Sequence, residues 1–265
     1  MAYLPSKMTL RKEFVWNESF WTPDELGADL ALWLDAEDTD TITLNGSNVA
    51  QWDDKSGNGN HATQAIAASQ PAYGSATING VSAIDFVQDA LDIPVLGGES
   101  DWALFQIAEP TVTTPSNFAS IIASSVQVAG SFQIGVFDTN LTVVSNSDAN
   151  VAVNPTIVFG AYETVPLIFS LTANGSGTNG FLNGALADST AVTLRKAPLT
   201  AFRIGTNRAN SVRLDHKNGE LVFVLGAISD TDRQRMEGYL AWKWGLVANL
   251  PVSHPYKIAP PQRNI

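Results

Sequence analysis

Asn-Gly dipeptides between apolar segments constrain the fold of this chain most strongly. They stand at Asn45-Gly46, Asn79-Gly80, Asn183-Gly184 and Asn218-Gly219. Type I′ hairpin turns need positive φ at both central residues, and Asn and Gly tolerate that conformation best. Each dipeptide therefore predicts a tight turn between two antiparallel strands, and their repetition predicts sheets built from hairpins.

Short segments rich in β-branched and aromatic residues fill most of the remaining chain. No segment with helical periodicity interrupts them, which excludes alternating β-α-β units. We therefore predict an all-β fold, a jelly-roll β-sandwich of two antiparallel sheets. Segment 221–228 is apolar on both faces and is expected to be a central strand. The other expected strands are 31–35, 82–87, 102–108, 118–129, 131–137, 156–162 and 166–171.

One C-terminal α-helix is expected to begin at Ser229 and to end at Gly245. Ser229 and Asp232 resemble a capping pair, and Gly245 can adopt the left-handed conformation of a C-terminal cap. From Leu250 the tail contains too many prolines for regular structure and is expected to lie extended over the domain. The apolar face of the helix carries Met236, Leu240 and Trp244, spaced at i, i+4 and i+8.

Residues 49–63 predict a compact loop. A short apolar approach ends at Trp52, and glycine then alternates with asparagine from Gly57 to Asn60. These residue types suit a tight turn with internal hydrogen bonds. We expect Trp52 to anchor the loop in the core and His61 to bond to the loop backbone.

The same loop carries oxygen ligands of the kind that calcium prefers. Lys55 lies among them, and the loop could use the same groups for its own hydrogen bonds, so both interpretations stay open. The sequence predicts no cofactor and leaves a structural calcium ion as an option. The calcium candidates are Asp53, Asp54 and Asn58, with Asn60 beside them.

The first 22 residues differ in composition from the rest and mix charges with aromatic side chains. Such a short segment cannot form a core of its own. It could lie over its own domain, or it could dock the chain to a larger assembly. We divide the chain into a docking arm, 1–22, and a jelly-roll domain, 23–265. The docking candidates are Phe14, Trp16, Phe20 and Trp21.

Composition limits the partners. The net charge of −11 and scattered Lys and Arg argue against nucleic acid, which needs a basic surface. No apolar run approaches the ~18 residues of a membrane helix, and no signal peptide is evident. The chain has no cysteine, which excludes disulfides and thiolate metal sites.

Known catalytic patterns are missing from the sequence. The closest acidic cluster lies between Asp35 and Asp40, includes Glu37 and Asp38, and is expected to be a solvated loop. It lacks the acidic motif of a retaining glycosidase strand. The histidines have no paired metal spacing, and His254 is expected to pack. Surface aromatics could stack on sugars, but core packing is the usual role. The candidates for stacking are Tyr73, Trp102 and Tyr162.

In order along the chain, several of these segments resemble laminin-G-like members of the concanavalin A-like lectin/glucanase superfamily, in the form found in bacteriophage structural proteins and bacterial surface proteins. The resemblance covers about residues 25 to 262 and implies a jelly-roll that binds or assembles without shared catalytic residues. Residues from about 87 to 221 match no family motif. The resembling segments are 32–36, 51–63, 70–73, 79–86, 237–246 and 250–256.

The resemblance implies a non-enzymatic bacteriophage virion protein, such as a capsid decoration, head fibre or tail-associated subunit. Its partners would be other virion proteins, within a homo-oligomer or larger assembly, and its location the virion, assembled in the host cytoplasm. A host-surface glycan is a further possible partner. The alternative is a carbohydrate-binding module or adhesin. A glycoside hydrolase is the third interpretation.

Overall fold

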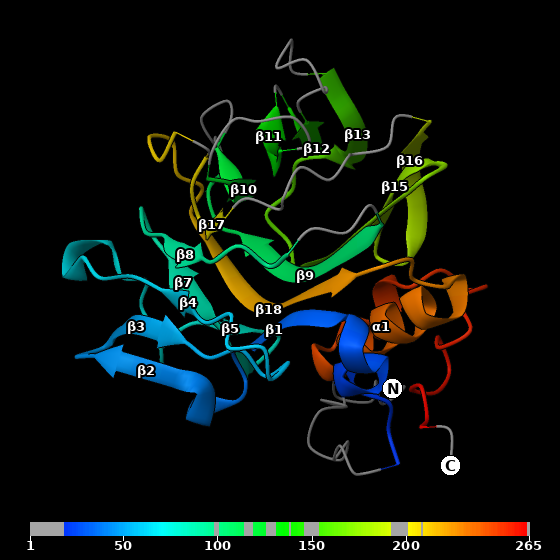
Figure 1. The fold of residues 1–265 in the computed structure, drawn as a ribbon, viewed down its shortest axis with the longest axis horizontal. Helices are drawn as coiled ribbons and strands as arrows, with labels where there is room; N and C mark the ends of the chain where they lie inside the picture. The colour runs from blue at the N-terminus through cyan, green and yellow to red at the C-terminus, as the bar shows by residue number, and fades with distance from the viewer. Residues whose placement is uncertain are drawn as a thin grey trace, which may run out of the picture.

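The computed structural model describes residues 19–97, 101–113, 119–125, 131–137, 139–145, 154–191, 201–207 and 209–263. The fold is mostly β, with two antiparallel sheets and one C-terminal α-helix, as the sequence predicts. The sheets form two layers, and helix α1 (Asp230–Lys243) covers the side of one sheet that faces away from the other sheet (Figure 1). Among the described residues, no helix combines the length and the apolar character that crossing a membrane requires.

The first sheet has seven strands, and β18 lies inside it, next to the edge strand β1. The pairing order is β1 (Leu30–Asp35), β18 (His216–Leu225), β9 (Trp102–Pro110), β14 (Leu167–Asn174), β15 (Gly177–Leu182) and β16 (Ala185–Thr190), and β7 (Ile84–Phe86) also pairs with β18. Strand β18 lies between β1 and β9 and is buried along most of its length. This confirms the prediction that segment 221–228 contributes a central strand.

The second sheet has nine strands. Their order is β13 (Asn154–Ala161), β12 (Asn140–Ser145), β11 (Phe132–Phe137), β10 (Ser120–Ser124), β17 (Phe202–Ile204), β8 (Leu91–Ile93), β4 (Ala62–Thr63), β3 (Asn48–Trp52) and β2 (Ile42–Asn45). A separate small hairpin pairs β5 (Thr77–Ile78) with β6 (Val81–Ser82). Short 3₁₀ turns are η2 (Pro23–Asp29), η3 (Thr39–Thr41), η4 (Ala67–Ser69) and η5 (Val247–Asn249).

Aromatic rings join the two sheets across the interior. Trp102 of β9 stacks on Phe132 of β11 with 5.0 Å between ring centroids, and on Phe223 of β18 at 5.4 Å. Phe202 of β17 lies 5.5 Å from Phe223. Trp52 is fully buried, as predicted. Burial of such rings supplies much of the driving force for closing a sandwich.

The Asn-Gly prediction is right at two of the four positions. Asn79 and Gly80 have φ of 50° and 81° and join β5 to β6, and Asn183 and Gly184 have φ of 51° and 79° and join β15 to β16. These are the positive values that a type I′ turn requires. The expected β2–β3 hairpin also exists, but Asn45 stays in β2 and pairs with Asn48, so the turn begins at Gly46.

The predicted turn at Asn218-Gly219 is wrong. Both residues lie inside β18, where the register with β9 shifts between Asn218 and Glu220. Besides forming turns, glycine inside a strand often marks a β-bulge or a place where another group packs closely. At Gly219 the reason is close packing, because a Cβ would stand 2.8 Å from the ring of Trp244.

The helix prediction is confirmed. Ser229 caps α1, and its hydroxyl accepts a 3.0 Å hydrogen bond from the Asp232 N–H. Gly245, with φ of 67°, follows the last turn. The predicted apolar residues Met236, Leu240 and Trp244 are fully buried. Their burial against the outer face of the first sheet fixes the helix in place.

Candidate functional site: a polar groove beside helix α1

The loop of residues 53–61 is built around the carboxylate of Asp54. Asp54 Oδ1 accepts hydrogen bonds from the backbone N–H groups of Trp33 and Ser56, both at 2.9 Å. Its Oδ2 accepts from the Asn60 N–H at 3.0 Å and from the Ser56 hydroxyl at 2.7 Å. A short carboxylate thereby satisfies three backbone donors, which explains why the sequence forms a fixed loop here.

The calcium candidates use their polar groups within the fold. The side-chain amides of Asn58 and Asn60 donate to the carbonyls of Leu30 and Ala31, each at 2.8 Å. Asp53 accepts from the Gln51 amide at 2.6 Å. Within the described part of the chain, no three His, Cys, Asp or Glu side chains gather as a metal site. The loop therefore follows the predicted alternative of internal hydrogen bonding.

His61 bonds to the loop backbone as predicted, because its Nδ1 accepts from the Asp54 N–H at 3.1 Å. His254 is buried, with Nε2 3.4 Å from the Glu237 carboxylate, which confirms that it packs.

The prediction of a solvated acidic loop is wrong for Asp35. This carboxylate is buried, and it contacts Lys243 Nζ at 2.6 Å and Lys55 Nζ at 3.0 Å. The Lys55 ammonium also contacts Asp38, at 2.6 Å. Burial alone would raise the pKa of Asp35, but the two lysine charges and their hydrogen bonds outweigh it and lower the pKa from its usual value.

Glu220 is the centre of this buried ion network. Its Oε1 accepts from the indole N–H of Trp33 at 2.7 Å and from the Tyr239 hydroxyl at 2.8 Å. Its Oε2 accepts from the Trp244 indole at 2.8 Å and contacts Lys243 Nζ at 2.9 Å. Burial raises the pKa of Glu220, and Lys243 offsets part of that rise. The four bonds occupy both oxygens, so the network stabilises the fold and presents no free acid.

The predicted aromatic platforms are engaged in packing. Trp102 is buried in the interior stack, and the Tyr73 and Tyr162 hydroxyls donate to the carbonyls of Ala36 and Val112 at 2.7 and 2.8 Å. Burial raises the pKa of Tyr162 to about 12. Both tyrosines are half-buried. They contribute to the fold through their hydroxyls.

Among the docking candidates, Phe14 and Trp16 lie outside the described residues. Trp21 is buried with its ring 6.3 Å from that of Tyr239, so it packs on its own domain. Phe20 pairs with Gln262 of the tail. The sequence left open that this segment lies over its own domain. Residues 20 and 21 do so.

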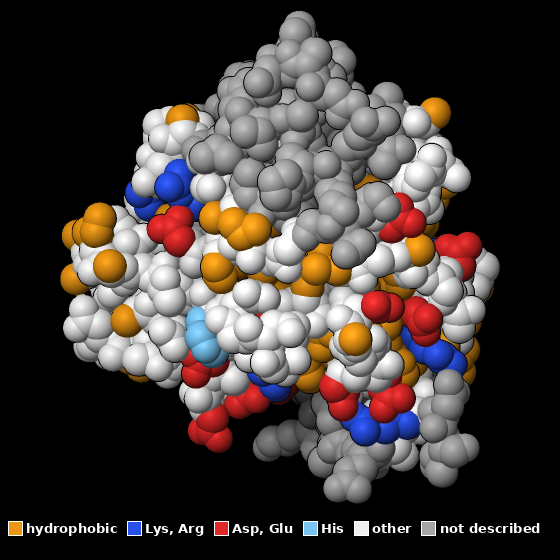
Figure 2. All heavy atoms as spheres, viewed as in Figure 1, with side chains coloured by type: hydrophobic (Ala, Val, Ile, Leu, Met, Phe, Trp, Pro, Cys, Tyr) orange, Lys and Arg blue, Asp and Glu red, His pale blue; other side chains and the backbone are white. Residues whose placement is uncertain are grey.

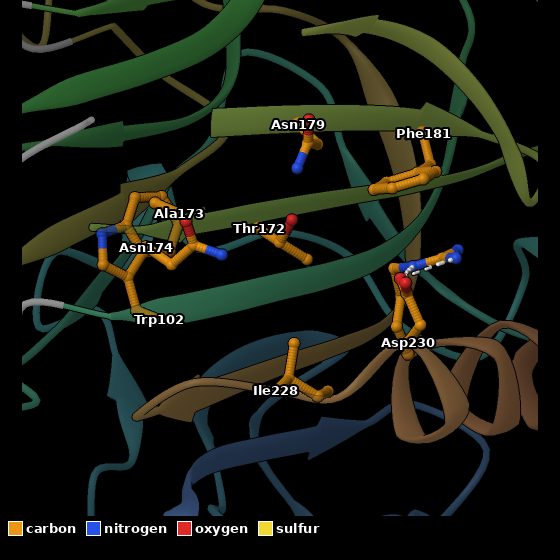
Figure 3. A pocket seen from close by; sticks show the side chains of 9 residues that line it. Trp102, Thr172, Ala173, Asn174, Asn179, Phe181, Ile228 and Asp230 are labelled. Atoms are coloured by element: carbon orange, nitrogen blue, oxygen red, sulfur yellow. Dashed lines mark hydrogen bonds and ion pairs between the residues drawn. The ribbon is translucent and has the colours of Figure 1, made fainter. Parts of the chain in front are cut away.

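A polar groove opens where the outer face of the first sheet meets the first turn of α1 (Figure 3). Its cavity has a volume of about 190 Å³. Thr172 of β14 stands opposite Asn179 of β15 in the register, so both side chains lie on the same face of the sheet. The lining residues are Trp102, Thr172, Ala173, Asn174, Asn179, Phe181, Ile228, Asp230 and Arg233.

A second cavity of about 320 Å³ continues the groove toward β16. Asn174 and Asn179 line both cavities, so the two cavities adjoin. We call the two cavities together the β15 groove. The second cavity is lined by Asn174, Ser176, Gly177, Asn179, Ser189, Thr190 and Ala191.

Arg233 forms one wall of the β15 groove. Its guanidinium lies 3.9 Å from the centroid of the Phe181 ring, donates to Glu237 at 2.7 Å, and contacts Asp230 at 3.3 Å. The cation is therefore neutralised and held flat against the aromatic ring. Figure 3 shows Asp230 and Ile228 on the helix side of the groove, across from Thr172 and Asn179.

The groove offers uncharged hydrogen-bonding groups. In the described structure, Asn179 makes no side-chain hydrogen bond with another protein group, and the Asn174 amide uses only its oxygen, which accepts from the Ser176 N–H at 2.9 Å. Asp230 is the one acidic side chain among the described lining residues. Glycoside hydrolysis usually requires a pair of carboxyl groups. Its amide and hydroxyl groups can both donate and accept hydrogen bonds.

Sequence reasoning did not identify this groove. The available signal was the alternation of polar Thr172 and Asn174 with buried Leu171 and Ala173, which indicates a strand with one polar face. The contribution of Arg233 depends on where α1 docks, and no local pattern reports that.

Charge on the surrounding surface is patchy. On the face drawn in Figure 2, Lys and Arg side chains form small separate groups beside acidic side chains. On this face, the described residues do not form the continuous basic surface on which nucleic acid binding depends.

No protein-family model matches the sequence, and a search of curated proteins also finds no match. Solved structures do match. Domain 4 of AbnA, an extracellular arabinanase from Geobacillus stearothermophilus solved with arabinotriose, has a TM-score of 0.56 at 12% identity, over 77% of this chain and 95% of that one. The receptor-binding domain of botulinum neurotoxin D has a TM-score of 0.56 at 14% identity, over 78% and 52%.

Trypanosoma rangeli sialidase, solved with the inhibitor DANA, has a TM-score of 0.54 at 13% identity, over 82% of this chain and 34% of that one. The chain thus spans about half of the toxin domain and one third of the sialidase. At these identities the likeness shows the fold alone. The shared fold is a jelly-roll β-sandwich of two antiparallel sheets.

Proposed function

We propose that this chain is a non-enzymatic binding domain that holds a carbohydrate in the β15 groove. The observation that carries the proposal is the pair of Asn174 and Asn179, which share two adjoining cavities and offer amide groups with free hydrogen-bonding capacity. Neutral sugars present many hydroxyls that both donate and accept, and amide side chains match both roles.

The size of the groove supports an extended ligand. The two cavities measure about 190 and 320 Å³, and ligand pockets usually occupy a few hundred Å³. The similar arabinanase domain was solved with arabinotriose, which is consistent with an oligosaccharide on a sandwich of this kind. Phe181 adds an apolar surface beneath Arg233 at one end.

The virion role implied by the sequence resemblance is tested by none of these observations and stays a prediction. The same holds for virion partners, for assembly into a homo-oligomer and for location in the virion. A binding function in the β15 groove is compatible with that role and does not depend on it.

A glycan array and calorimetry test the proposal. The wild-type chain should bind a restricted set of glycans, and Asn179→Ala should weaken binding about tenfold, the effect of one or two lost hydrogen bonds. Asn249→Ala, an exposed asparagine in η5, is the matched control and should bind like wild type. An array without any bound glycan, or equal affinity for both variants, contradicts the proposal.

A second measurement separates binding from hydrolysis. The bound glycan should be recovered intact after long incubation with the protein, with no new reducing ends. Release of products that Asp230→Asn abolishes would show instead that the groove is a catalytic site.

A further inference from the structure

Three polar side chains lie inside the sandwich without hydrogen-bond partners at their ends. Gln106 of β9 and His216 and Asn218 of β18 are each fully buried. Among the described residues, no group bonds to the side-chain nitrogen or oxygen of Gln106 or Asn218, or to Nε2 of His216. We call these three residues the interior polar cluster. It lies outside the β15 groove.

Strand register places the cluster on one face of the sheet. Asn218 stands opposite Ala108 of β9, and Gln106 stands opposite Leu221 of β18. Because residues 106 and 108 share a face, Gln106 and Asn218 are diagonal neighbours, and such pairs are within reach of long side chains. His216 is two residues from Asn218 and shares its face.

The face in question points between the two sheets. Gln106 also stands opposite Phe169 of β14, whose ring lies 5.8 Å from that of Phe159 in the second sheet. The bulge at Gly219 lets Asn218 and Glu220, two residues apart in β18, point to opposite faces of the sheet. Glu220 points outward to Trp244, while Asn218 points inward.

Only one ring nitrogen of His216, Nδ1, has a hydrogen-bond partner among the described residues. Its Nδ1 lies 2.8 Å from the Leu214 carbonyl, which can only accept, so Nδ1 carries the proton and Nε2 is a bare acceptor. Burial lowers the pKa of His216 to about 4, which keeps the ring neutral near neutral pH. The ring stacks on Phe86 at 4.8 Å and is held in this orientation.

A buried donor or acceptor without a partner loses its hydration and gains nothing in return. Five such atoms on one face of the sheet require a partner that can both donate and accept. A cation would leave the two amide NH₂ groups unpaired, and an anion would oppose the lone pair of Nε2. Water meets both requirements, and buried water in proteins typically makes about three such bonds.

We propose that ordered water occupies the interior of the sandwich, bound by Gln106, His216 and Asn218. In this site water donates to His216 Nε2 and to an amide oxygen, and accepts from an amide NH₂ group. A small hydroxylated molecule has the same chemistry, and electron density distinguishes the two by size.

A high-resolution crystal structure of the whole chain tests this directly. The expected result is a water molecule within hydrogen-bond distance of Gln106 and of at least one of His216 and Asn218. Direct bonds between the three side chains, or a space without density, overturn the proposal, and density larger than water replaces water with a bound molecule.

The sign of a stability change gives an independent test. In a hydrated site, Gln106→Met removes bonds to water and leaves the other members unpaired, so Tm should fall by about 2–4 °C or more. In a dry site the same change removes two unpaired atoms at nearly constant volume, so Tm should rise. The matched control is Leu104→Met, on the same face of β9, which changes shape without changing hydrogen bonding.

Discussion

Trp33 and Glu220, 187 positions apart in the sequence, are joined by a 2.7 Å hydrogen bond from the indole N–H to the buried carboxylate. Trp33 belongs to β1 and Glu220 to β18, and the same carboxylate accepts from Trp244 at the end of α1. One side chain therefore connects two strands to the helix that covers them.

Replacing Lys243 with methionine should destabilise the fold strongly. Lys243 is buried and lies between Asp35 at 2.6 Å and Glu220 at 2.9 Å, so the variant leaves two buried carboxylates without their shared cation. Such a loss typically costs about 3–5 kcal/mol. Urea unfolding measures it. Lys217→Met, which removes the more exposed pair with Glu109, should cost less than about 1 kcal/mol.

Asp54→Asn should weaken the loop of residues 53–61. An amide nitrogen at either position faces at least one backbone N–H donor, so one or two of the four hydrogen bonds to this side chain are lost. We expect a loss of about 2 kcal/mol or more, measured by thermal or urea unfolding. Asp53→Asn changes a partly exposed neighbour and should cost less than about 1 kcal/mol. Equal effects of the two variants would contradict the central role of Asp54.

Calcium should not change the melting temperature. The oxygens of Asp54 already accept four hydrogen bonds, and a calcium ion would have to displace those donors. Calorimetric scans with calcium and with a chelator should superimpose. A midpoint that rises with calcium concentration would show that the loop reorganises around the ion.

Stability should decrease as the pH falls below about 6.5, in part because of His216. Burial lowers its pKa from 6.5 to about 4, so between these values the unfolded chain binds a proton that the folded chain does not. The contribution is complete above pH 6.5 and is lost on the way down to pH 4, up to about 3 kcal/mol.

Unfolding measured at several pH values checks this contribution. His216→Gln should flatten the curve between pH 6.5 and 4, whatever its effect on stability at neutral pH. A slope that survives in His216→Gln would assign the pH dependence to other groups.

Gly219→Ala should destabilise the protein although alanine suits a strand better than glycine. The new Cβ would stand 2.8 Å from Trp244 ring atoms, and Trp244 is held by its own bond to Glu220. Overpacking of this kind costs about 1–3 kcal/mol. Gly175→Ala is the control, because a Cβ there meets no atom within 4 Å. Its effect should stay within about 0.5 kcal/mol.

The features that local chemistry determines could be predicted from the sequence. Asn79-Gly80 forms the expected turn because its two φ values are set by the residues themselves. Ser229 caps α1 through a bond three residues away. Trp52 is buried because its large apolar ring lies in a short apolar segment, and burying that ring removes much apolar surface from water.

The features that depend on distant partners could not be predicted. Asp35 follows a strand and precedes other acids, which is typical of a solvated loop, yet Lys243 joins it from a helix about 200 positions later. Asn218-Gly219 has the composition of a turn, but the ring of Trp244 decides that it is a bulge. The β15 groove needs two strands, a hairpin and the start of a helix, and no motif links them.

The ends of the described chain are bonded to each other. The Trp21 N–H donates to the Pro261 carbonyl at 3.0 Å, the Arg263 N–H donates to the Ser19 carbonyl at 2.9 Å, and Phe20 pairs with Gln262. Residues 19–21 and residues 261–263 therefore lie side by side. A host polypeptide could carry this domain in a loop as a side branch, and a circular permutant that joins the two ends with a short linker and opens a hairpin elsewhere should keep the same sandwich.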